Sequence, residues 1–218
     1  MMTSAAPDTE TADCIAIIVA AGSGNRAGPA PHHDTTQRGS ENKLEKQFWP
    51  LAGKPVLTHS VDIFRAHPRV KAIIIVTAPH NIERVRSQFD EPNCSIIAGG
   101  ATRQQSVYAG LRAAADIDPA ARFVTIHDAA RPLLPPALLS TMLATITDEV
   151  AGVAPALPLA DTLSYINAQQ TVDRIIDRTP IRALQTPQLF WRELITDCLL
   201  YTSPSPRDMR RSRMPSSA

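Results

Sequence analysis

A strand-like run that leads into a glycine loop with a nearby arginine is the first feature of this chain that could do chemistry. The stretch CIAIIVAAGSGNRAG places Gly22 and Gly24 just after the apolar residues 15–19, and Arg26 follows closely. Glycines after a buried strand let the backbone approach a phosphate. An arginine beside them suits a triphosphate whose charge shifts during a reaction. The third glycine of a dinucleotide fingerprint and the GK[ST] of a P-loop are absent, so the loop predicts another kind of phosphate site, with a plain tight turn as the alternative.

Three further polar motifs follow in chain order. Lys46 lies in EKQFWPLAGKPVL, Gly100 and Ser106 lie in AGGATRQQSVYAGLRAA, and Asp128 and Arg131 lie in TIHDAARPLL. An aspartate at the carboxyl end of a strand can hold a divalent metal or a ligand hydroxyl. Taken singly, these motifs are compatible with a solvated lysine, an ordinary strand-to-helix turn and a capping aspartate.

The elements that must position these residues alternate between strand and helix patterns. We expect strands near 15–19, 72–77, 95–98, 123–126 and 152–156, and helices near 55–65, 80–89, 102–115 and 136–147. This alternation predicts an α/β fold with a doubly wound, mostly parallel sheet. Ligands of such sheets bind at the carboxyl ends of the strands.

Three segments carry no such pattern. Residues 1–13 are polar and acidic, and we expect a flexible lead-in. Residues 28–45 are polar and rich in turn formers, which predicts a mobile loop. Residues 200–218 are dominated by Ser, Pro and Arg and offer little to bury, so we expect disorder there. The remaining predicted domain spans 14–199.

Composition excludes several classes of function. The formal net charge is +1, which gives no electrostatic argument for nucleic acid or for an anionic membrane. No apolar run approaches the length of a membrane span, and the first residues lack the pattern of a signal peptide. The three cysteines are far apart, without a CxxC pair, which favours a cytoplasmic protein with reduced thiols and no zinc site.

The four motifs in this order, together with DTL, either VDR or IDR within 172–178, and ALQTPQLF further on, resemble the methylerythritol-phosphate cytidylyltransferases of non-mevalonate isoprenoid biosynthesis. The resemblance covers roughly residues 15–199. It implies a Rossmann-like nucleotidyltransferase fold with a protruding dimerisation arm at about 157–180. It also implies transfer of CMP from CTP to 2-C-methyl-D-erythritol 4-phosphate with release of pyrophosphate, Mg²⁺ held mainly by the triphosphate rather than by protein ligands, and a homodimer.

The same resemblance implies roles for individual residues. Arg26 and Lys46 would be catalytic, holding the triphosphate and stabilising charge at the α-phosphorus. The residues implied for the nucleotide pocket are Ala20, Ala21, Gly22, Gly24, Gly100, Ser106, Asp128 and Ala129. The residues implied for the acceptor are Arg131, Thr162, Arg178 and Thr186.

The chain also departs from the family pattern. The spacing between Arg26 and Lys46 is longer than usual, and Glu45 stands where a proline normally precedes the lysine, which leaves Lys43 as the alternative. After about Leu199 the family's last elements are replaced by a tail that we interpret as non-native. Two alternative functions follow: a ribitol 5-phosphate cytidylyltransferase, or a catalytically inactive nucleotide-binding chain. A fusion to a second enzymatic domain, as some members have, is also left open.

Overall fold

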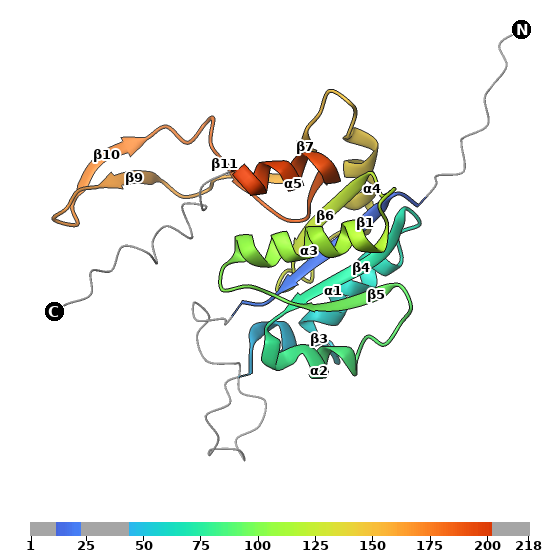
Figure 1. The fold of residues 1–218 in the computed structure, drawn as a ribbon. Coiled ribbons are helices and arrows are strands. Elements are labelled where there is room, and N and C mark those ends of the chain that lie inside the picture. The colour runs from blue at the N-terminus through green and yellow to red at the C-terminus, as the bar shows by residue number, and fades with distance from the viewer. Residues whose placement is uncertain (1–11, 23–43, 202–218) are drawn as a thin grey trace, which may run out of the picture.

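The structure, a computed structural model, describes residues 12–22 and 44–201 (Figure 1). Several predictions therefore lie outside the described residues: Gly24, Arg26, Lys43, most of the lead-in 1–13, most of the loop 28–45 and the tail beyond 201.

A six-stranded sheet forms the centre of the molecule, in the order β5-β4-β1-β6-β12-β7. The strands are β1 (Cys14–Ala20), β4 (Val70–Thr77), β5 (Cys94–Ala98), β6 (Phe123–Asp128), β7 (Gly152–Val153) and β12 (Gln188–Trp191). The first four are parallel to one another, whereas β12 pairs antiparallel with both β6 and β7. The predicted α/β fold with a mostly parallel sheet is confirmed.

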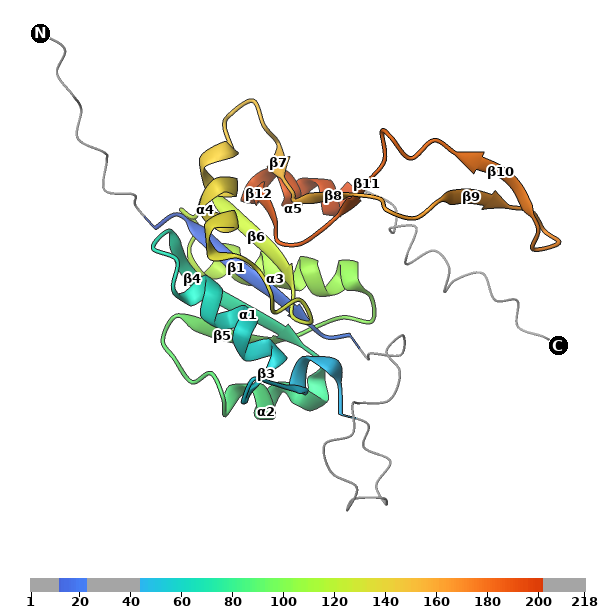
Figure 2. The same cartoon turned by 180° about the vertical axis from the view of Figure 1, so that it is seen from behind.

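Helices cover both faces of this sheet (Figures 1 and 2). The helices α1 (Val56–Arg65) and α4 (Pro136–Thr145) lie on one face, and α3 (Arg103–Ile117) and α5 (Arg192–Tyr201) lie on the other. The short α2 (Ile82–Arg86) packs on the α1 side through Val85. The helix α5 runs past the predicted domain boundary at 199.

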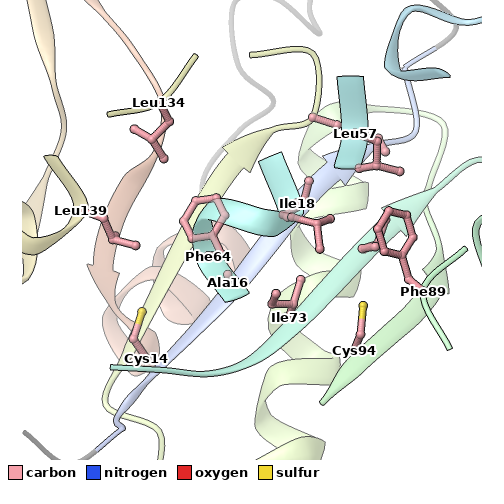
Figure 3. Close-up of a cluster of buried hydrophobic side chains, with 14 of the residues drawn as sticks. Cys14, Ala16, Ile18, Leu57, Phe64, Ile73, Phe89, Cys94, Leu134 and Leu139 are labelled. Carbon is pink, nitrogen blue, oxygen red and sulfur yellow. The ribbon is translucent and has the colours of Figure 1, made fainter. Parts of the chain in front are cut away.

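The core is divided between the two faces because alternate strand residues point in opposite directions. In β1, Ala16 and Ile18 join the cluster under α1 and α4, while Ile15 and Ile17 join the cluster under α3. Figure 3 shows Phe64 of α1 packed into the first cluster. Strands buried on both faces need the continuous apolar runs that the sequence shows.

Two expected elements differ in the structure. The helix predicted at 80–89 is a 3₁₀ turn, η2 (Pro79–Asn81), followed by the short α2. The strand predicted at 152–156 is divided, because β7 stays in the main sheet while β8 (Ala156–Pro158) leaves it. A 3₁₀ turn, η1 (Lys46–Phe48), and a small hairpin of β2 (Pro50–Leu51) and β3 (Lys54–Pro55) precede α1.

An antiparallel arm projects from the body, as both views show (Figures 1 and 2). Strand β8 pairs with β11 (Arg182–Leu184), and β9 (Leu163–Ile166) pairs with β10 (Val172–Ile176). The projecting arm agrees with the expectation for about 157–180, whereas its role in dimerisation stays a prediction. No helix among the described residues has the length and apolarity needed to cross a bilayer.

Candidate functional site

The carboxyl end of β1 carries the first predicted nucleotide contacts. Ala20 is buried, Ala21 is half-buried, and Gly22 is exposed with open space around it. The side chain of Gln47 donates from Nε2 to the carbonyl oxygen of Ala20 over 2.9 Å. This bond fixes the 3₁₀ turn that contains Lys46 at the carboxyl end of β1.

Glu45 helps to hold that turn in place. Its carboxylate accepts hydrogen bonds from the side chains of Gln47 and of Asn81, the latter at 3.1 Å. It also lies 2.9 Å from Nε2 of the exposed His80. Among the described residues, no hydrogen bond or ion pair engages the ammonium group of Lys46. Glu45 thus anchors the backbone beside Lys46, and the lysine side chain is left available for a ligand.

The turn after β5 packs closely against the end of β1. A Cβ at Gly99 would lie 2.6 Å from Cβ of Ala21 and 2.8 Å from Oγ of Ser106, so no larger residue fits there. The hydroxyl oxygen of Ser106 accepts from the backbone N–H of Gly100 at 3.1 Å, and Ser106 is 1% exposed. Gly99 therefore packs against Ala21, and Ser106 is bonded to the adjacent Gly100. Contacts of Gly100 and Ser106 with a nucleotide stay a prediction.

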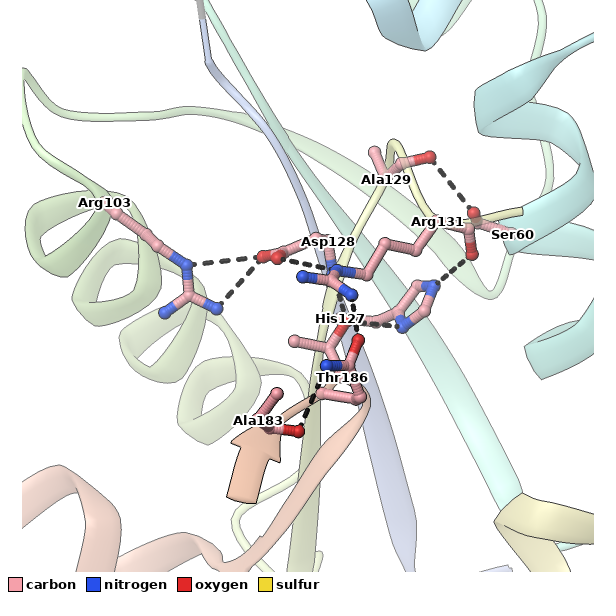
Figure 4. Close-up of polar contacts among 9 residues, drawn as sticks. Ser60, Arg103, His127, Asp128, Ala129, Arg131, Ala183 and Thr186 are labelled. Atoms are coloured by element: carbon pink, nitrogen blue, oxygen red, sulfur yellow. Dashed lines mark hydrogen bonds and ion pairs between the residues drawn. The ribbon is translucent and has the colours of Figure 1, made fainter. Parts of the chain in front are cut away.

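Asp128, the last residue of β6, lies between two guanidinium groups (Figure 4). Arg103, the first residue of α3, donates to Oδ1 at 3.0 Å, and Nε of Arg131 is 3.4 Å from Oδ2. Arg131 also donates to the side-chain oxygen of Gln185. Both carboxylate oxygens are engaged and 27% of the side chain is exposed, so Asp128 is oriented yet reachable by a ligand hydroxyl.

Beneath this surface, His127 is fully buried and joins two turns. Its Nδ1 lies 3.2 Å from Oγ1 of Thr186, and its Nε2 lies 3.1 Å from the carbonyl oxygen of Arg131. The Thr186 hydroxyl also accepts from the backbone N–H of Asp128 at 3.2 Å. Burial lowers the pKa of His127 from 6.5 to about 4, so the ring is neutral near pH 7.

Ala129 is part of the site's framework. Its N–H donates to the carbonyl oxygen of Val19 at 3.0 Å, and its own carbonyl oxygen accepts from Oγ of the buried Ser60 at 3.1 Å. The turn after β6 is thereby fixed to both β1 and α1. A nucleotide contact at Ala129 stays a prediction.

Two of the predicted acceptor residues lie in the arm, apart from this cluster. Thr162 and Arg178 are exposed, and the guanidinium of Arg178 donates to the carbonyl oxygen of Ala160 within the same arm. Among the described residues, neither makes a hydrogen bond or ion pair with Asp128, Arg131 or Thr186. The structure thus brings Arg131 and Thr186 together and leaves Thr162 and Arg178 elsewhere.

The donor set offers little to a metal ion on its own. Within residues 12–22 and 44–201, no group of three or more His, Cys, Asp or Glu side chains is arranged to hold one. Asp128 is already paired with two guanidinium groups.

Sequence reasoning did not select four residues that the structure places in this cluster: Gln47, Gly99, Arg103 and His127. All four lie inside the motifs already quoted. Arg103 precedes Ser106 by one helical turn, a spacing that puts both on one side of α3 and could have identified it. The bonds of Gln47 and His127 join segments far apart in the sequence, which motif spacing does not show.

This arrangement combines a backbone turn with small residues, an available lysine, two arginines and an oriented aspartate. Such a set can bind a phosphorylated nucleotide and a second polar molecule at one sheet edge. The chemistry that it suits is positioning and charge stabilisation.

Comparisons with known proteins agree with this geometry. The family model described as 2-C-methyl-D-erythritol 4-phosphate cytidylyltransferase (IspD) matches residues 14–206. A bifunctional enzyme IspD/IspF of Bartonella tribocorum is 39% identical over 178 residues, which cover 80% of this chain and 41% of that protein. The chain thus spans less than half the length of this relative.

Solved structures show the same fold. The bifunctional IspDF of Campylobacter jejuni matches with a TM-score of 0.69 and 25% identity, over 91% of this chain and 46% of that one. A 4-diphosphocytidyl-2C-methyl-D-erythritol synthase of Anaerococcus prevotii matches with a TM-score of 0.66 and 23% identity, over 94% and 78% of the two chains. With its motifs assembled at one sheet edge and the family match extending over most of its length, the chain belongs to the 2-C-methyl-D-erythritol 4-phosphate cytidylyltransferase family.

Proposed function

We propose that the chain transfers CMP from CTP to 2-C-methyl-D-erythritol 4-phosphate and releases pyrophosphate. The observation that carries the proposal is the polar cluster at the carboxyl ends of the parallel strands, where Asp128 is held between Arg103 and Arg131 and Gly99 packs against Ala21. Its members come from the motifs that distinguish this family, and the family match supports the substrate pair.

The reaction follows from the charges of the reactants. An oxygen of the acceptor phosphate attacks the α-phosphorus of CTP, and the bond from that phosphorus to the β-phosphate oxygen breaks. The attacking oxygen is already anionic, so the step needs no general base. Lys46, with Arg26 of the glycine loop, would stabilise the negative charge that builds up around the α-phosphorus.

Mg²⁺ is the proposed cofactor, carried mainly by the oxygens of the triphosphate. When bound, it would neutralise charge on the departing pyrophosphate. The paired state of Asp128 supports this arrangement, because the carboxylate is committed to two arginines. We also propose a cytoplasmic location, since the three cysteines are far apart in the sequence and form no CxxC pair.

The arm supports a proposal of homodimerisation. Its apolar side chains Tyr165, Val172 and Ile175 are each more than half exposed, which is unusual for an isolated chain. Thr162 and Arg178 are also exposed in the arm, away from the site of their own chain. In a dimer, Thr162 and Arg178 would reach the acceptor bound at the carboxyl end of β6 in the other subunit.

The experiment that tests the function is a coupled assay of pyrophosphate release by the full chain. The assay contains CTP, Mg²⁺ and either methylerythritol phosphate or ribitol 5-phosphate. We expect release to require methylerythritol phosphate and to be much slower with ribitol 5-phosphate. A preference for ribitol 5-phosphate would identify the related cytidylyltransferase instead. Binding of CTP without release of its pyrophosphate in the presence of either acceptor would show a nucleotide-binding chain without transferase activity.

A further inference from the structure

His127 lies at the next-to-last position of β6, under the two turns that carry predicted acceptor-binding side chains. Its ring is fully buried and contacts Phe64 of α1 edge to face, with the ring centres 5.3 Å apart. Its two nitrogens reach Thr186 and the backbone of Arg131, at 3.2 Å and 3.1 Å (Figure 4). One buried side chain therefore touches both turns at once.

The partners of the ring determine where its proton lies. The carbonyl oxygen of Arg131 can only accept, so Nε2 carries the hydrogen and donates it. Burial keeps the ring neutral near pH 7, because it lowers the pKa of His127 to about 4. In the neutral ring Nδ1 is then an acceptor, and the hydroxyl of Thr186 must donate to it.

This direction limits what Thr186 can offer to a ligand. Its single hydroxyl hydrogen points inward to His127, and its oxygen already accepts from the N–H of Asp128 at 3.2 Å. What remains is acceptor capacity on the oxygen. Thr186 can therefore accept a hydrogen bond from a hydroxyl of a bound molecule, but it cannot donate one to a phosphate oxygen.

We propose that His127 is a positioning residue for the acceptor substrate. It holds the Thr186 hydroxyl as an acceptor for a substrate hydroxyl, and it fixes the turn from which Arg131 extends. The assignment of a substrate contact rests on the proposed function. The direction of the hydrogen bonds does not, and it can be measured without any substrate.

The first test is therefore spectroscopic. Long-range ¹H–¹⁵N correlation spectra of the full chain near pH 7 distinguish protonated from bare ring nitrogens. We expect His127 to carry its proton on Nε2 and none on Nδ1, and the Thr186→Val variant to shift the Nδ1 resonance most. A proton on Nδ1, or a doubly protonated ring, would overturn the proposal whatever the enzyme's activity.

The second test separates the two bonds of the ring with three variants. His127→Asn keeps an acceptor oxygen near the position of Nδ1, His127→Gln keeps a donor near Nε2, and His127→Phe removes both nitrogens while retaining a ring beside Phe64. We expect the KM for the acceptor to rise about tenfold in the Gln and Phe variants, the loss of one oriented hydrogen bond. The Asn variant loses the bond to the Arg131 carbonyl but keeps an acceptor for Thr186, so its acceptor KM should rise less than in the other two variants. The KM for CTP should change little in all three.

A matched control separates positioning from general stability. Phe64→Leu weakens packing on the same ring without removing a hydrogen bond. We expect this variant to lower the melting temperature and to leave the acceptor KM unchanged. If the acceptor KM instead follows the melting temperature across all four variants, His127 has only a structural role and the proposal fails.

Discussion

The carboxyl end of β6 and the projecting arm both carry predicted acceptor-binding residues, but the chain holds them in different ways. At the carboxyl end of β6 the side chains have partners from distant segments: Asp128 pairs with Arg103, and Thr186 binds both Asp128 and His127. In the arm, Arg178 is exposed and binds only its own arm among the described residues.

The residues predicted for the acceptor thus fall into two groups: this chain holds those near β6 in place, and it leaves those in the arm exposed. A two-stranded antiparallel ribbon is marginally stable in water without a further surface to pack on. In β9 and β10, Tyr165, Val172 and Ile175 are 51%, 61% and 65% exposed. These exposures are what a ribbon that packs on a second subunit would show before it is covered.

The largest effect should be on stability. Removing a core side chain should lower the free energy of unfolding far more than a similar truncation in the arm. Phe64→Ala should lower the free energy of unfolding by about 3–5 kcal/mol, because it opens a cavity under α1. Ile175→Ala should change it by less than about 0.5 kcal/mol at concentrations where the chain is monomeric. Urea denaturation of both variants measures this, and comparable losses would contradict the contrast between the two regions.

The next effect concerns catalysis at the carboxyl ends of the parallel strands. Lys46→Ala should lower kcat by about 10²–10³-fold with little change in CTP affinity, because its charge is needed most in the transition state. Steady-state kinetics and CTP titration measure the two quantities. Lys43→Ala is the matched control. A near-normal kcat for Lys46→Ala together with a large loss for Lys43→Ala would move the catalytic role to Lys43.

The buried histidine predicts a pH dependence of stability. The pKa of His127 is 6.5 when exposed and about 4 when folded, so between these values the unfolded chain binds more protons. The contribution of His127 to the free energy of unfolding is therefore complete above pH 6.5. It is lost as the pH falls toward 4, by about 3 kcal/mol in total. His127→Phe should flatten the fall in that window, as unfolding curves at several pH values can show. An equal slope in the variant would assign the dependence to other groups.

The smallest effect should come from the arm arginine. Arg178→Ala should raise the KM for the acceptor by about 10–100-fold, the range for losing one charge-assisted hydrogen bond. CTP binding should be unaffected, because the contact proposed for Arg178 is with the acceptor alone. Arg182→Ala, which removes another exposed arm arginine, is the control. Equal effects of the two variants would argue against a specific role for Arg178.

Much of the fold could be predicted from the sequence because its signals are local. The apolar run of β4 and the spaced apolar residues of α1 predicted the bounds of this strand and this helix to within a few residues. The antiparallel direction of β12 could not be predicted, since it depends on pairing with β6, more than fifty residues away. The hairpin β2–β3 was missed because it rests on left-handed backbone at Ala52 and Gly53, with φ of 48° and 81°.

In the candidate site, too, local signals could be read from the sequence and long-range contacts could not. Asp128 and Ser106 were identified because their motifs place them at strand and helix ends. His127 and Gln47 were not selected, although each joins two segments by hydrogen bonds of its side chain. A histidine and a glutamine look ordinary in sequence, and only the fold shows that both are buried and which distant groups they bind.

The measurement that tests this account most directly is the activity of mixed subunits. Lys46→Ala and Arg178→Ala chains are purified separately, mixed in equal amounts and allowed to exchange, with exchange followed by mass-tagged subunits. If the arm of one subunit completes the site at the carboxyl end of β6 in the other subunit, each mixed dimer regains one intact site. The mixture should then recover about one quarter of the parent activity, given random pairing. Complete exchange without recovery, or a chain that stays monomeric while active, would contradict the account.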